Sequence, residues 1–405
     1  MRIPDSCIAR ERGYVVVDDE VRRAYRCIPN DRYGFLLSDV YQKKVDIFWP
    51  KVNLTAVDGE LFSNPDLKTV EVGYIDHVIY WPEMSTADRK KAVLFLCDVC
   101  TYLCAHNLHM ESHLWNVVLQ HGKPFLIDIG DFFEGVNLSS IKATILGTIY
   151  GKRDLEQTTH APVTPESWIS NYSLILKKLE EMESITEPTT YLQQLKKCLE
   201  DISPTLEAQV WDSYPTQKNS PKDKASLEAY AANQRPALCK VIKEKSPTTL
   251  VDIGCSYGMY SFFAALQGAT TVGFDYSQGM ISAANQKSQD MGLNCNFAYV
   301  DLLNISAWGV NGCYNNCLER FKSDAVIAPA VIHHVHGKNK TLQQIITEWA
   351  SMARQWIMLE YIPFDTSNRP ISSELIVNTL STLGFSSIKF MDSSPLPRQW
   401  ILAEK

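Results

Sequence analysis

Three carboxylates in the second half of the chain, each at the end of an apolar run, have a spacing suited to binding a nucleoside. Asp252 ends the first run and precedes a loop with glycines at Gly254 and Gly258. Asp275 ends the second run, about 21 residues beyond Gly254, the spacing at which a carboxylate meets the two hydroxyls of a ribose. Asp301 ends the third run. Because glycines let a backbone approach a ligand closely, the pattern predicts a cofactor site.

Each of these acids also has a purely structural interpretation. Asp252 could cap a loop amide, and Asp275 and Asp301 could be solvated acids at strand ends. A glycine loop alone is a weak signal, because an ordinary turn between a strand and a helix also needs glycine. The occurrence of all three acids in register favours a binding site over three separate structural roles.

Alternating strands and helices are expected to position these acids. The run 249–253 is short, apolar and β-branched, which is typical of a strand buried on both faces, and the apolar run from Met259 predicts a helix packed on it. The order of the elements predicts a doubly wound, mostly parallel sheet. Further strands are expected at 270–274, 296–300, 323–328, 355–359, 387–391 and 398–403, and helices at 277–285, 341–354 and 372–383.

The second half resembles the S-adenosylmethionine-dependent methyltransferases over nearly all of its length. Asp252-x-Gly254-x-Ser256-x-Gly258 matches their glycine motif, with Ser256 in place of the central glycine, and the last two strands fit their reversed seventh strand. The resemblance implies an α/β Rossmann-like domain with a seven-stranded, mostly parallel sheet. Three segments are similar to a branch that includes nodulation-type methyltransferases: 318–320, 332–334 and 359–363.

The same resemblance implies S-adenosylmethionine as the cofactor and a set of residues that bind it. Asp275 would bind the ribose hydroxyls, Tyr276 would lie against the adenine, and Asp301 with Leu302 would meet the adenine edge. The segment 328–334 would line the face where the methyl group meets its acceptor. The implied cofactor-binding residues are Asp252, Gly254, Cys255, Ser256, Gly258, Asp275, Tyr276, Asp301, Leu302 and Ala328.

Methyl transfer from a sulfonium is an in-line displacement, so the protein mainly aligns the acceptor and removes its proton. His333 and His334 lie where the fourth strand meets the expected site, and a neutral imidazole is suited to deprotonating a hydroxyl or an ammonium. They are the predicted catalytic base or acceptor-positioning groups, with Glu360 orienting the acceptor. In the structural alternatives, one histidine is a core residue bonded to a backbone carbonyl, and Glu360 pairs with Arg369 or Lys338.

The first half resembles the protein-kinase-like superfamily. His109 and Asn116 have the spacing of the first and last residues of the catalytic loop, and Asp-Ile-Gly at 128–130 matches the metal-binding Asp-Phe-Gly. In an intact site, Asn116 and Asp128 would share a Mg²⁺ that binds ATP. The match is partial, because Glu111 replaces the catalytic aspartate and neither a glycine-rich loop nor the strand lysine is found. A kinase-like fold that has lost phosphotransfer is the alternative.

The chain is expected to form two domains, because 405 residues exceed one ordinary domain. The segment 214–224 is polar, with two prolines and three lysines, and is the most linker-like in the chain. We expect a small, divergent α+β kinase-like domain over 1–213, a linker and lead-in helix over 214–235, and a methyltransferase domain over 236–405. In the first domain, strands are expected at 14–17, 21–28, 52–62 and 69–75, and helices at 33–44, 85–107 and 167–202, the last broken at 186–190.

Composition indicates an ordinary globular protein, with 45% apolar and 21% charged residues. The formal net charge of −7 argues against a binder of bulk nucleic acid. No apolar run approaches the roughly 20 residues needed to span a bilayer, and the first residues do not begin a signal peptide. The 11 cysteines are odd in number and mostly lie in apolar runs, which favours core thiols in a reducing, cytoplasmic location.

Three functions remain open. The first is a methyltransferase acting on an O or N acceptor of a small metabolite or glycan, with the kinase-like domain binding substrate or serving as a scaffold. The second is a bifunctional kinase and methyltransferase that modifies one substrate twice. The third is a non-catalytic regulatory protein that binds S-adenosylmethionine or a nucleotide, and the glycine loop followed by two spaced acids argues against it. Any oligomeric state is compatible with the sequence.

Overall fold

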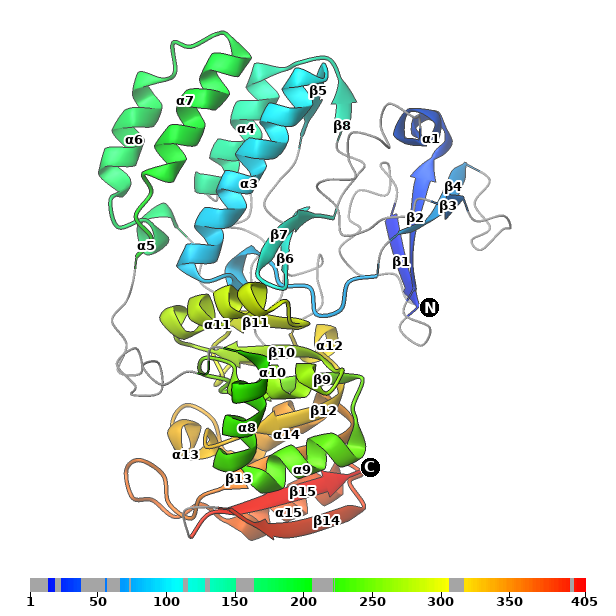
Figure 1. Cartoon of the computed structure of the whole chain (residues 1–405), viewed down its shortest axis with the longest axis vertical. Coiled ribbons are helices and arrows are strands. Elements are labelled where there is room, and N and C mark those ends of the chain that lie inside the picture. The colour runs from blue at the N-terminus through cyan, green and yellow to red at the C-terminus, as the bar shows by residue number, and fades with distance from the viewer. Residues whose placement is uncertain are drawn as a thin grey trace.

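The chain forms an N-terminal half and a C-terminal half that are stacked along the long axis of the molecule (Figure 1). The structure is a computed structural model that describes residues 14–18, 23–37, 55–56, 66–72, 74–111, 116–127, 132–150, 164–205, 221, 223–305, 317–393 and 397–405. Described residues up to 205 make up the N-terminal half, and those from 221 onward make up the C-terminal half.

A seven-stranded sheet forms the centre of the C-terminal half. Its strands are β9 (Thr249–Ile253), β10 (Thr270–Asp275), β11 (Cys295–Tyr299), β12 (Ser323–Ala328), β13 (Ala353–Tyr361), β14 (Ser387–Asp392) and β15 (Gln399–Glu404). The order is β11-β10-β9-β12-β13-β15-β14, and β15 alone runs antiparallel to its neighbours in this sheet. The predicted Rossmann-like fold, with a mostly parallel sheet and a reversed last strand, is confirmed.

Helices cover both faces of this sheet because its central strands carry apolar side chains on both faces. The helices are α8 (Lys224–Gln234), α9 (Pro236–Lys245), α10 (Met259–Leu266), α11 (Gln278–Met291), α12 (Cys317–Arg320), α13 (Ile332–Val335), α14 (Leu342–Ser351) and α15 (Ser373–Thr382). Leu250 and Ile327 pack in a hydrophobic cluster with residues of α8 to α11, whereas Val251 and Val326 pack with α14 and α15. All residues of β9 are buried, as expected for a central strand of a parallel sheet.

One boundary in the C-terminal half differs from the prediction. The helix expected over 341–354 ends at Ser351, and β13 begins at Ala353, which pairs with Ser323 of β12. The parallel ladder satisfies the backbone groups of these residues, and this tertiary pairing overrides the local helical pattern. The helix was therefore predicted about three residues too long at its C-terminal end.

An antiparallel sheet of order β1-β2-β4-β3 lies at the start of the N-terminal half. Its elements are β1 (Tyr14–Asp18), β2 (Arg23–Pro29), β3 (Thr55–Ala56) and β4 (Leu67–Val72), with α1 (Asn30–Leu37) after β2. The predicted hairpin is confirmed, since Tyr14 pairs with Cys27. The helix expected over 33–44 begins earlier, at Asn30, and its remainder, like most of 52–62, lies outside the described residues.

A 20-residue helix, α3 (Thr86–Ala105), runs through the N-terminal half and packs against α4 and α7. Ser85, the first residue of the helix expected over 85–107, caps α3, because its Oγ accepts a hydrogen bond from the Asp88 amide (3.2 Å). The helix expected over 167–202 is broken between α6 and α7, but α7 begins at Pro188, inside the break expected at 186–190. Helix α4 was not predicted. The kinase-like fold of this half stays a prediction.

The other elements of the N-terminal half are η2 (Trp81–Glu83), β5 (Leu108–Met110), β6 (Val117–Gln120), β7 (Lys123–Leu126), β8 (Phe132–Glu134), α4 (Leu138–Tyr150), α5 (Pro165–Trp168), α6 (Tyr172–Glu181) and α7 (Pro188–Glu200).

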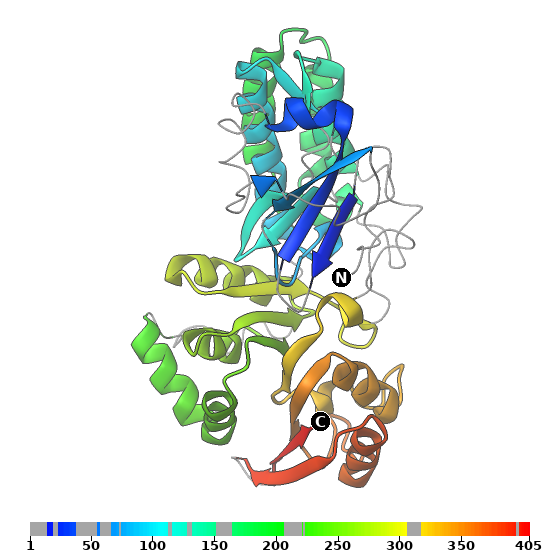
Figure 2. The same cartoon turned by 90° about the vertical axis from the view of Figure 1, so that its right-hand side faces the viewer.

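The two halves meet at the β11 edge of the C-terminal sheet, where α11 and β11 lie directly under the N-terminal half (Figures 1 and 2). Strand β6 and η2 contact β11, and α3 contacts α11. A single hydrophobic cluster includes buried residues of both halves, such as Ile79 and Val300. The halves therefore share an apolar core as well as a surface contact.

No described helix combines the length and the apolar character needed to cross a membrane. The cysteines in the described part of the chain are free thiols, and most are buried. Burial raises the pKa of Cys97 on α3 to about 12, so this thiol stays protonated. Within the described residues no group of three or more His, Cys, Asp or Glu side chains could bind a metal ion.

Candidate active site

The loop between β9 and α10 is fixed by the neighbouring strand β10. The amides of Gly254 and Cys255 both donate to the carbonyl of Phe274, at 2.8 and 3.0 Å. The Gly258 amide in turn donates to the Cys255 carbonyl at 2.9 Å and closes the turn before α10 begins. The predicted glycine loop is thus a defined turn at the C-terminal end of the central strand.

Glycine is required at both ends of this turn. Gly254 and Gly258 have φ of 71° and 85°, and Ser256 between them has φ of 52°. A Cβ on Gly254 would lie 2.6 Å from Cγ2 of Val331, and one on Gly258 would lie 2.5 Å from Cζ of Phe297. Residues that carry a side chain rarely adopt such positive φ values. The contact with Val331 also brings the segment before His333 directly against the loop.

Asp275 joins the glycine loop to the start of α11. Its carboxylate is buried, Oδ2 accepts a hydrogen bond from the Ser256 amide (2.8 Å), and Oδ1 accepts one from the Ser277 amide (2.9 Å). Ser277, the first residue of the helix expected over 277–285, caps α11 by accepting a hydrogen bond from the Met280 amide at its Oγ (3.3 Å). The Asp275 side chain therefore links Ser256, 19 positions earlier in the chain, to Ser277 at the start of α11.

The other residues of the predicted nucleoside site lie near Asp275. Tyr276, the next residue, is 40% exposed, which is unusual for a large aromatic side chain. The Val300 amide donates to the Asp275 carbonyl (3.0 Å), so Asp301 follows at the same edge of the sheet. The Asp301 carboxylate accepts from the Leu303 amide at 2.9 Å and from the Asn304 side chain at 3.0 Å, while Leu302 is buried. Cofactor binding by these residues stays a prediction.

Asp252 is fully buried beneath the loop. Its Oδ2 accepts a hydrogen bond from Ser261 Oγ of α10 (2.8 Å), and Oδ1 has no partner among the described residues. Burial raises the pKa of Asp252 to about 7, an effect that the Ser261 bonds oppose and nearby Asp275 reinforces. Ser261 was not singled out from the sequence, because its contact depends on how α10 packs on β9.

Asp252→Asn should stabilise the protein increasingly as the pH rises. The Asp252 carboxyl has a higher pKa in the folded protein (about 7) than in the unfolded chain. Its contribution to the free energy of unfolding of the wild type therefore falls between about pH 4 and pH 7 and stays low at higher pH. Asparagine removes that penalty and retains an oxygen for Ser261. We expect the difference in midpoint of thermal unfolding between the variant and the wild type to grow over this range. A pH-independent difference would contradict the assignment.

The predicted catalytic histidines form part of the short helix α13. The ring centroids of His333 and His334 lie 3.9 Å apart. Burial, with His334 and Arg398 nearby, lowers the pKa of His333 to about 4, and burial likewise lowers the pKa of His334. Nδ1 of His333 is buried and has no hydrogen-bond partner among the described residues. Both rings are therefore neutral at physiological pH.

Glu360 is fully buried near the end of β13, next to two arginines. Its Oε1 accepts a hydrogen bond from Ser393 Oγ (2.8 Å) and lies 3.5 Å from Arg235 Nε and 3.7 Å from Arg398 Nη1. Of the two partners considered from the sequence, Arg369 and Lys338, the first binds Asp365 instead. Arg235 precedes α9, whereas Ser393 and Arg398 flank the last turn. The sequence offers no spacing that links these three segments.

The predicted metal site lies in the N-terminal half and is described only in part. Asn116 is buried and its carbonyl accepts from the Ile127 amide (2.9 Å), whereas Asp128 lies outside the described residues. Nδ1 of His109 lies 2.8 Å from the Gly135 carbonyl, and Glu111 accepts from Ser140 Oγ at 3.2 Å. The Mg²⁺ site stays a prediction.

Residues 244–351 match the family model of a methyltransferase domain, so the C-terminal half contains this domain. The chain is 28% identical over 163 residues to nodulation protein NoeA of Rhizobium meliloti (strain 1021), which is 38% of this chain and 32% of the relative. The chain therefore spans about a third of the length of that curated relative.

Two solved structures are also similar to the chain. One is magnesium protoporphyrin IX methyltransferase (ChlM) from Synechocystis PCC 6803 with bound SAM, at 22% identity and a TM-score of 0.33, covering 45% of this chain and 79% of the other. The second is the bifunctional kinase-methyltransferase WbdD, at 22% identity and a TM-score of 0.32, covering 41% of this chain and 38% of the other.

Proposed function

We propose that the chain is an S-adenosylmethionine-dependent methyltransferase that transfers a methyl group to an O or N acceptor on a small metabolite or glycan. The observation that carries the proposal is the buried carboxylate of Asp275, which bonds the glycine loop and the first residues of α11 at the same time. The matched methyltransferase domain covers this whole arrangement. Binding of S-adenosylmethionine to the full chain, measured by titration calorimetry, tests it; absence of binding would contradict it.

The residues present fit this cofactor. Gly254 and Gly258 let the backbone follow the tight turn, with φ of 71° and 85°, and Asp275 offers two carboxylate oxygens, each able to accept more than one hydrogen bond, for two ribose hydroxyls. Tyr276, 40% exposed, offers an aromatic face for a base. S-adenosylmethionine, when bound, supplies an electrophilic methyl group on a sulfonium.

We propose His333 as the base, with His334 positioning the acceptor. A neutral imidazole would accept the proton of an acceptor hydroxyl as its oxygen takes the methyl group, or the proton of an ammonium before its nitrogen does so, and would later release it to water. The bond from the sulfonium sulfur to the methyl carbon would break as the new bond forms, and the sulfur would leave as a neutral thioether. His333 suits this role because its ring is neutral and its Nδ1 has no partner among the described residues. Glu360 is buried, so it would orient the acceptor through Arg398, whose side chain is 27% exposed.

Replacing both His333 and His334 with alanine should lower turnover by about 100-fold or more, because a positioned general base typically contributes that much. Cofactor affinity should remain that of the wild type. Since the pKa of His333 is about 4, the base is neutral at higher pH and the wild-type rate should fall only as the pH drops toward 4. The readout is S-adenosylhomocysteine released with an acceptor found by screening sugars and small hydroxy or amino compounds.

His106→Ala is the matched control. This histidine is in the N-terminal half, where its Nδ1 lies 2.8 Å from the Tyr102 carbonyl, so the rate and its pH profile should be unchanged. Turnover of the double variant close to that of the wild type would exclude both histidines from the chemistry.

For the rest of the chain we propose the domain limits 1–213, 214–235 and 236–405, with the first domain kinase-like and serving as a substrate-binding part or a scaffold. Helix α8 supports the placement of the lead-in with the methyltransferase domain, because Leu227 and Ala231 are fully buried and pack in the same cluster as α10.

A further inference from the structure

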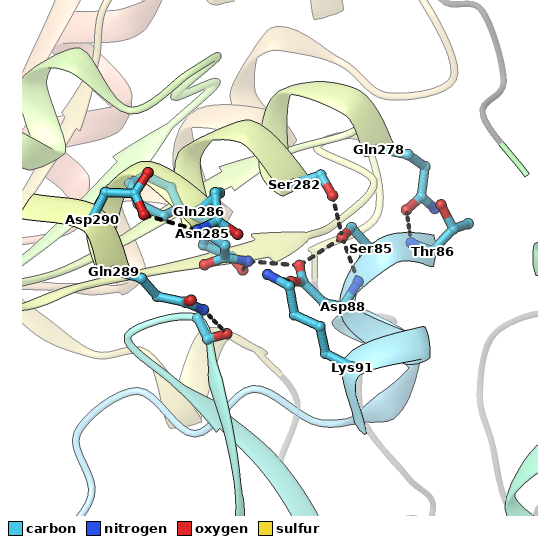
Figure 3. Close-up of polar contacts among 12 residues, drawn as sticks. Ser85, Thr86, Asp88, Lys91, Gln278, Ser282, Asn285, Gln286, Gln289 and Asp290 are labelled. Atoms are coloured by element: carbon cyan, nitrogen blue, oxygen red, sulfur yellow. Dashed lines mark hydrogen bonds and ion pairs between the residues drawn. The ribbon is translucent and has the colours of Figure 1, made fainter. Parts of the chain in front are cut away.

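One face of α11 is turned toward the N-terminal half along the whole length of the helix. Gln278, Ser282, Asn285 and Gln289 recur at the spacing of a single helical face, and all are directed at the N-terminal half (Figure 3). We call these four residues the polar face of α11. The neighbouring side chains Ile281 and Ala284 pack into the core of the C-terminal half. Helix α11 is thus enclosed between its own sheet and the other half of the chain.

Each residue of this polar face has a partner in the N-terminal half. The Thr86 amide donates to Gln278 Oε1 (3.0 Å), and the hydroxyls of Ser85 and Ser282 are 3.2 Å apart. Two more bonds follow farther along the helix: Asn285 Nδ2 donates to Asp88 Oδ2 (2.8 Å), and Gln289 Nε2 donates to the Gly122 carbonyl.

The partners belong to two segments of the N-terminal half, the start of α3 and the turn between β6 and β7. Ser85, Thr86 and Asp88 form the cap and first turn of α3, and Asp88 is fully buried, with Oδ1 3.2 Å from Lys91 Nζ. Gly122 lies in the turn between β6 and β7. A Cβ on Gly122, whose φ is 70°, would lie 2.7 Å from both the Asn285 carbonyl oxygen and Gln289 Nε2. The backbone of the turn at Gly122 therefore packs so closely against α11 that a residue with a Cβ would not fit there without a shift.

The edge strand β11 is attached in the same way. The His121 amide, in the same turn, donates to Asn296 Oδ1 (2.5 Å), and Asn285 Nδ2 also reaches the Phe297 carbonyl (3.1 Å). The N-terminal half therefore contacts the two elements that flank the proposed adenosine site, since α11 begins two residues after Tyr276 and Asp301 follows β11.

We propose that the N-terminal half supports the methyl-donor site from outside, and that its contact with the polar face of α11 sets the affinity for the adenosine part of the cofactor. This inference rests on the proposed function. The amide of Ser277, at the start of α11, donates to Asp275, so a shift of the helix moves the carboxylate and Tyr276 with it. A binding site loses affinity when its groups are held less firmly in the productive geometry.

A pair of glycine variants separates this effect from general damage. Gly122→Ala in the full chain should weaken binding of S-adenosylhomocysteine by about tenfold, because the new Cβ pushes the turn away from α11. Gly135→Ala is the matched control: Gly135 is in the same half and has φ of 86°, but nothing lies within 4 Å of its Cβ position. It should carry the same backbone strain and bind with wild-type affinity. Amide hydrogen exchange at 278–282 should be faster in Gly122→Ala alone.

A second pair keeps the test valid if Gly122→Ala does not fold. Gln289→Ala removes the bond to the Gly122 carbonyl about 16 Å along the helix from Gln278, far from the proposed cofactor contacts. Gln286→Ala is its control on the same helix, because Gln286 bonds only to Asp290 within α11 in the described residues (2.9 Å). We expect Gln289→Ala to weaken binding about threefold and Gln286→Ala to have no effect.

The outcomes distinguish this inference from the proposed function. If the wild type binds S-adenosylhomocysteine and each interface variant binds as tightly as its control, the inference is wrong and the proposed function stands. If the wild type does not bind, the proposed function is wrong and the inference falls with it. Weaker binding in both interface variants, with both controls unchanged, would support the inference.

Discussion

Asp275→Ala is expected to weaken S-adenosylmethionine binding by about 100-fold, the largest effect on cofactor affinity that the structure predicts. Two charge-assisted hydrogen bonds to ribose hydroxyls, at about 1.5 kcal/mol each, correspond to about 3 kcal/mol and hence to that factor. The change also releases the amides of Ser256 and Ser277, so the glycine loop and the start of α11 lose their common acceptor. Titration calorimetry with the full chain measures the affinity.

Asp290→Ala is the control for charge, since Asp290 is an exposed acid on α11 whose side chain accepts a bond from Gln286. It removes one negative charge from the same helix and should leave the affinity unchanged. An affinity of Asp275→Ala within about threefold of the wild type would place the ribose elsewhere.

Arg320→Met is expected to lower the free energy of unfolding by about 3–5 kcal/mol, the largest effect on stability, because it leaves a buried carboxylate without its counter-ion. Arg320 of α12 forms an ion pair with Glu83 of η2, with side-chain exposures of 9% and 3%, and also donates to the Val78 carbonyl (2.7 Å). Burial lowers the pKa of Arg320, but the Glu83 carboxylate, together with Cys317 and Tyr80, raises it overall. Urea denaturation followed by intrinsic fluorescence measures the loss.

Two comparisons make this prediction specific. Adding Glu83→Gln to Arg320→Met removes the orphaned charge and should recover a large part of the stability. Lys322→Met breaks the nearby pair with Glu319 (2.9 Å), whose side chains are 39% and 54% exposed, and should change stability by less than about 1 kcal/mol. If Arg320→Met and Lys322→Met lowered the free energy of unfolding equally, the buried ion pair would contribute no more to stability than the exposed one.

Elements with a strong local pattern were predicted correctly from the sequence. The strand over 249–253, the helix starts near Ser277 and Ser85, and the final pair of strands all appear as expected. The glycine loop and Asp275 lie together, because strand order in a parallel α/β unit brings the ends of consecutive strands to one edge. These signals lie within a short stretch of chain, where spacing alone determines the geometry.

Elements that depend on a distant partner were not predicted. Helix α14 stops at Ser351 because the next residues join β12, and a helical pattern carries no information about that ladder. Arg320 was noted as part of a branch-specific segment, yet its buried partner Glu83 is 237 positions away. The partners of Glu360, which come from the lead-in helices and the last turn, were missed for the same reason.

The sequence by itself determined the local order of strand, glycine loop and helix and the acids that follow each strand, because periodicity and spacing act over a few residues. Tertiary structure decided what surrounds that site. The polar face of α11 looks in the sequence like an ordinary solvated face, and only the packing of the N-terminal half turns Gln278 and Asn285 into an interface. Burial of polar groups requires partners, and those partners lie almost 200 residues away, at Thr86 and Asp88.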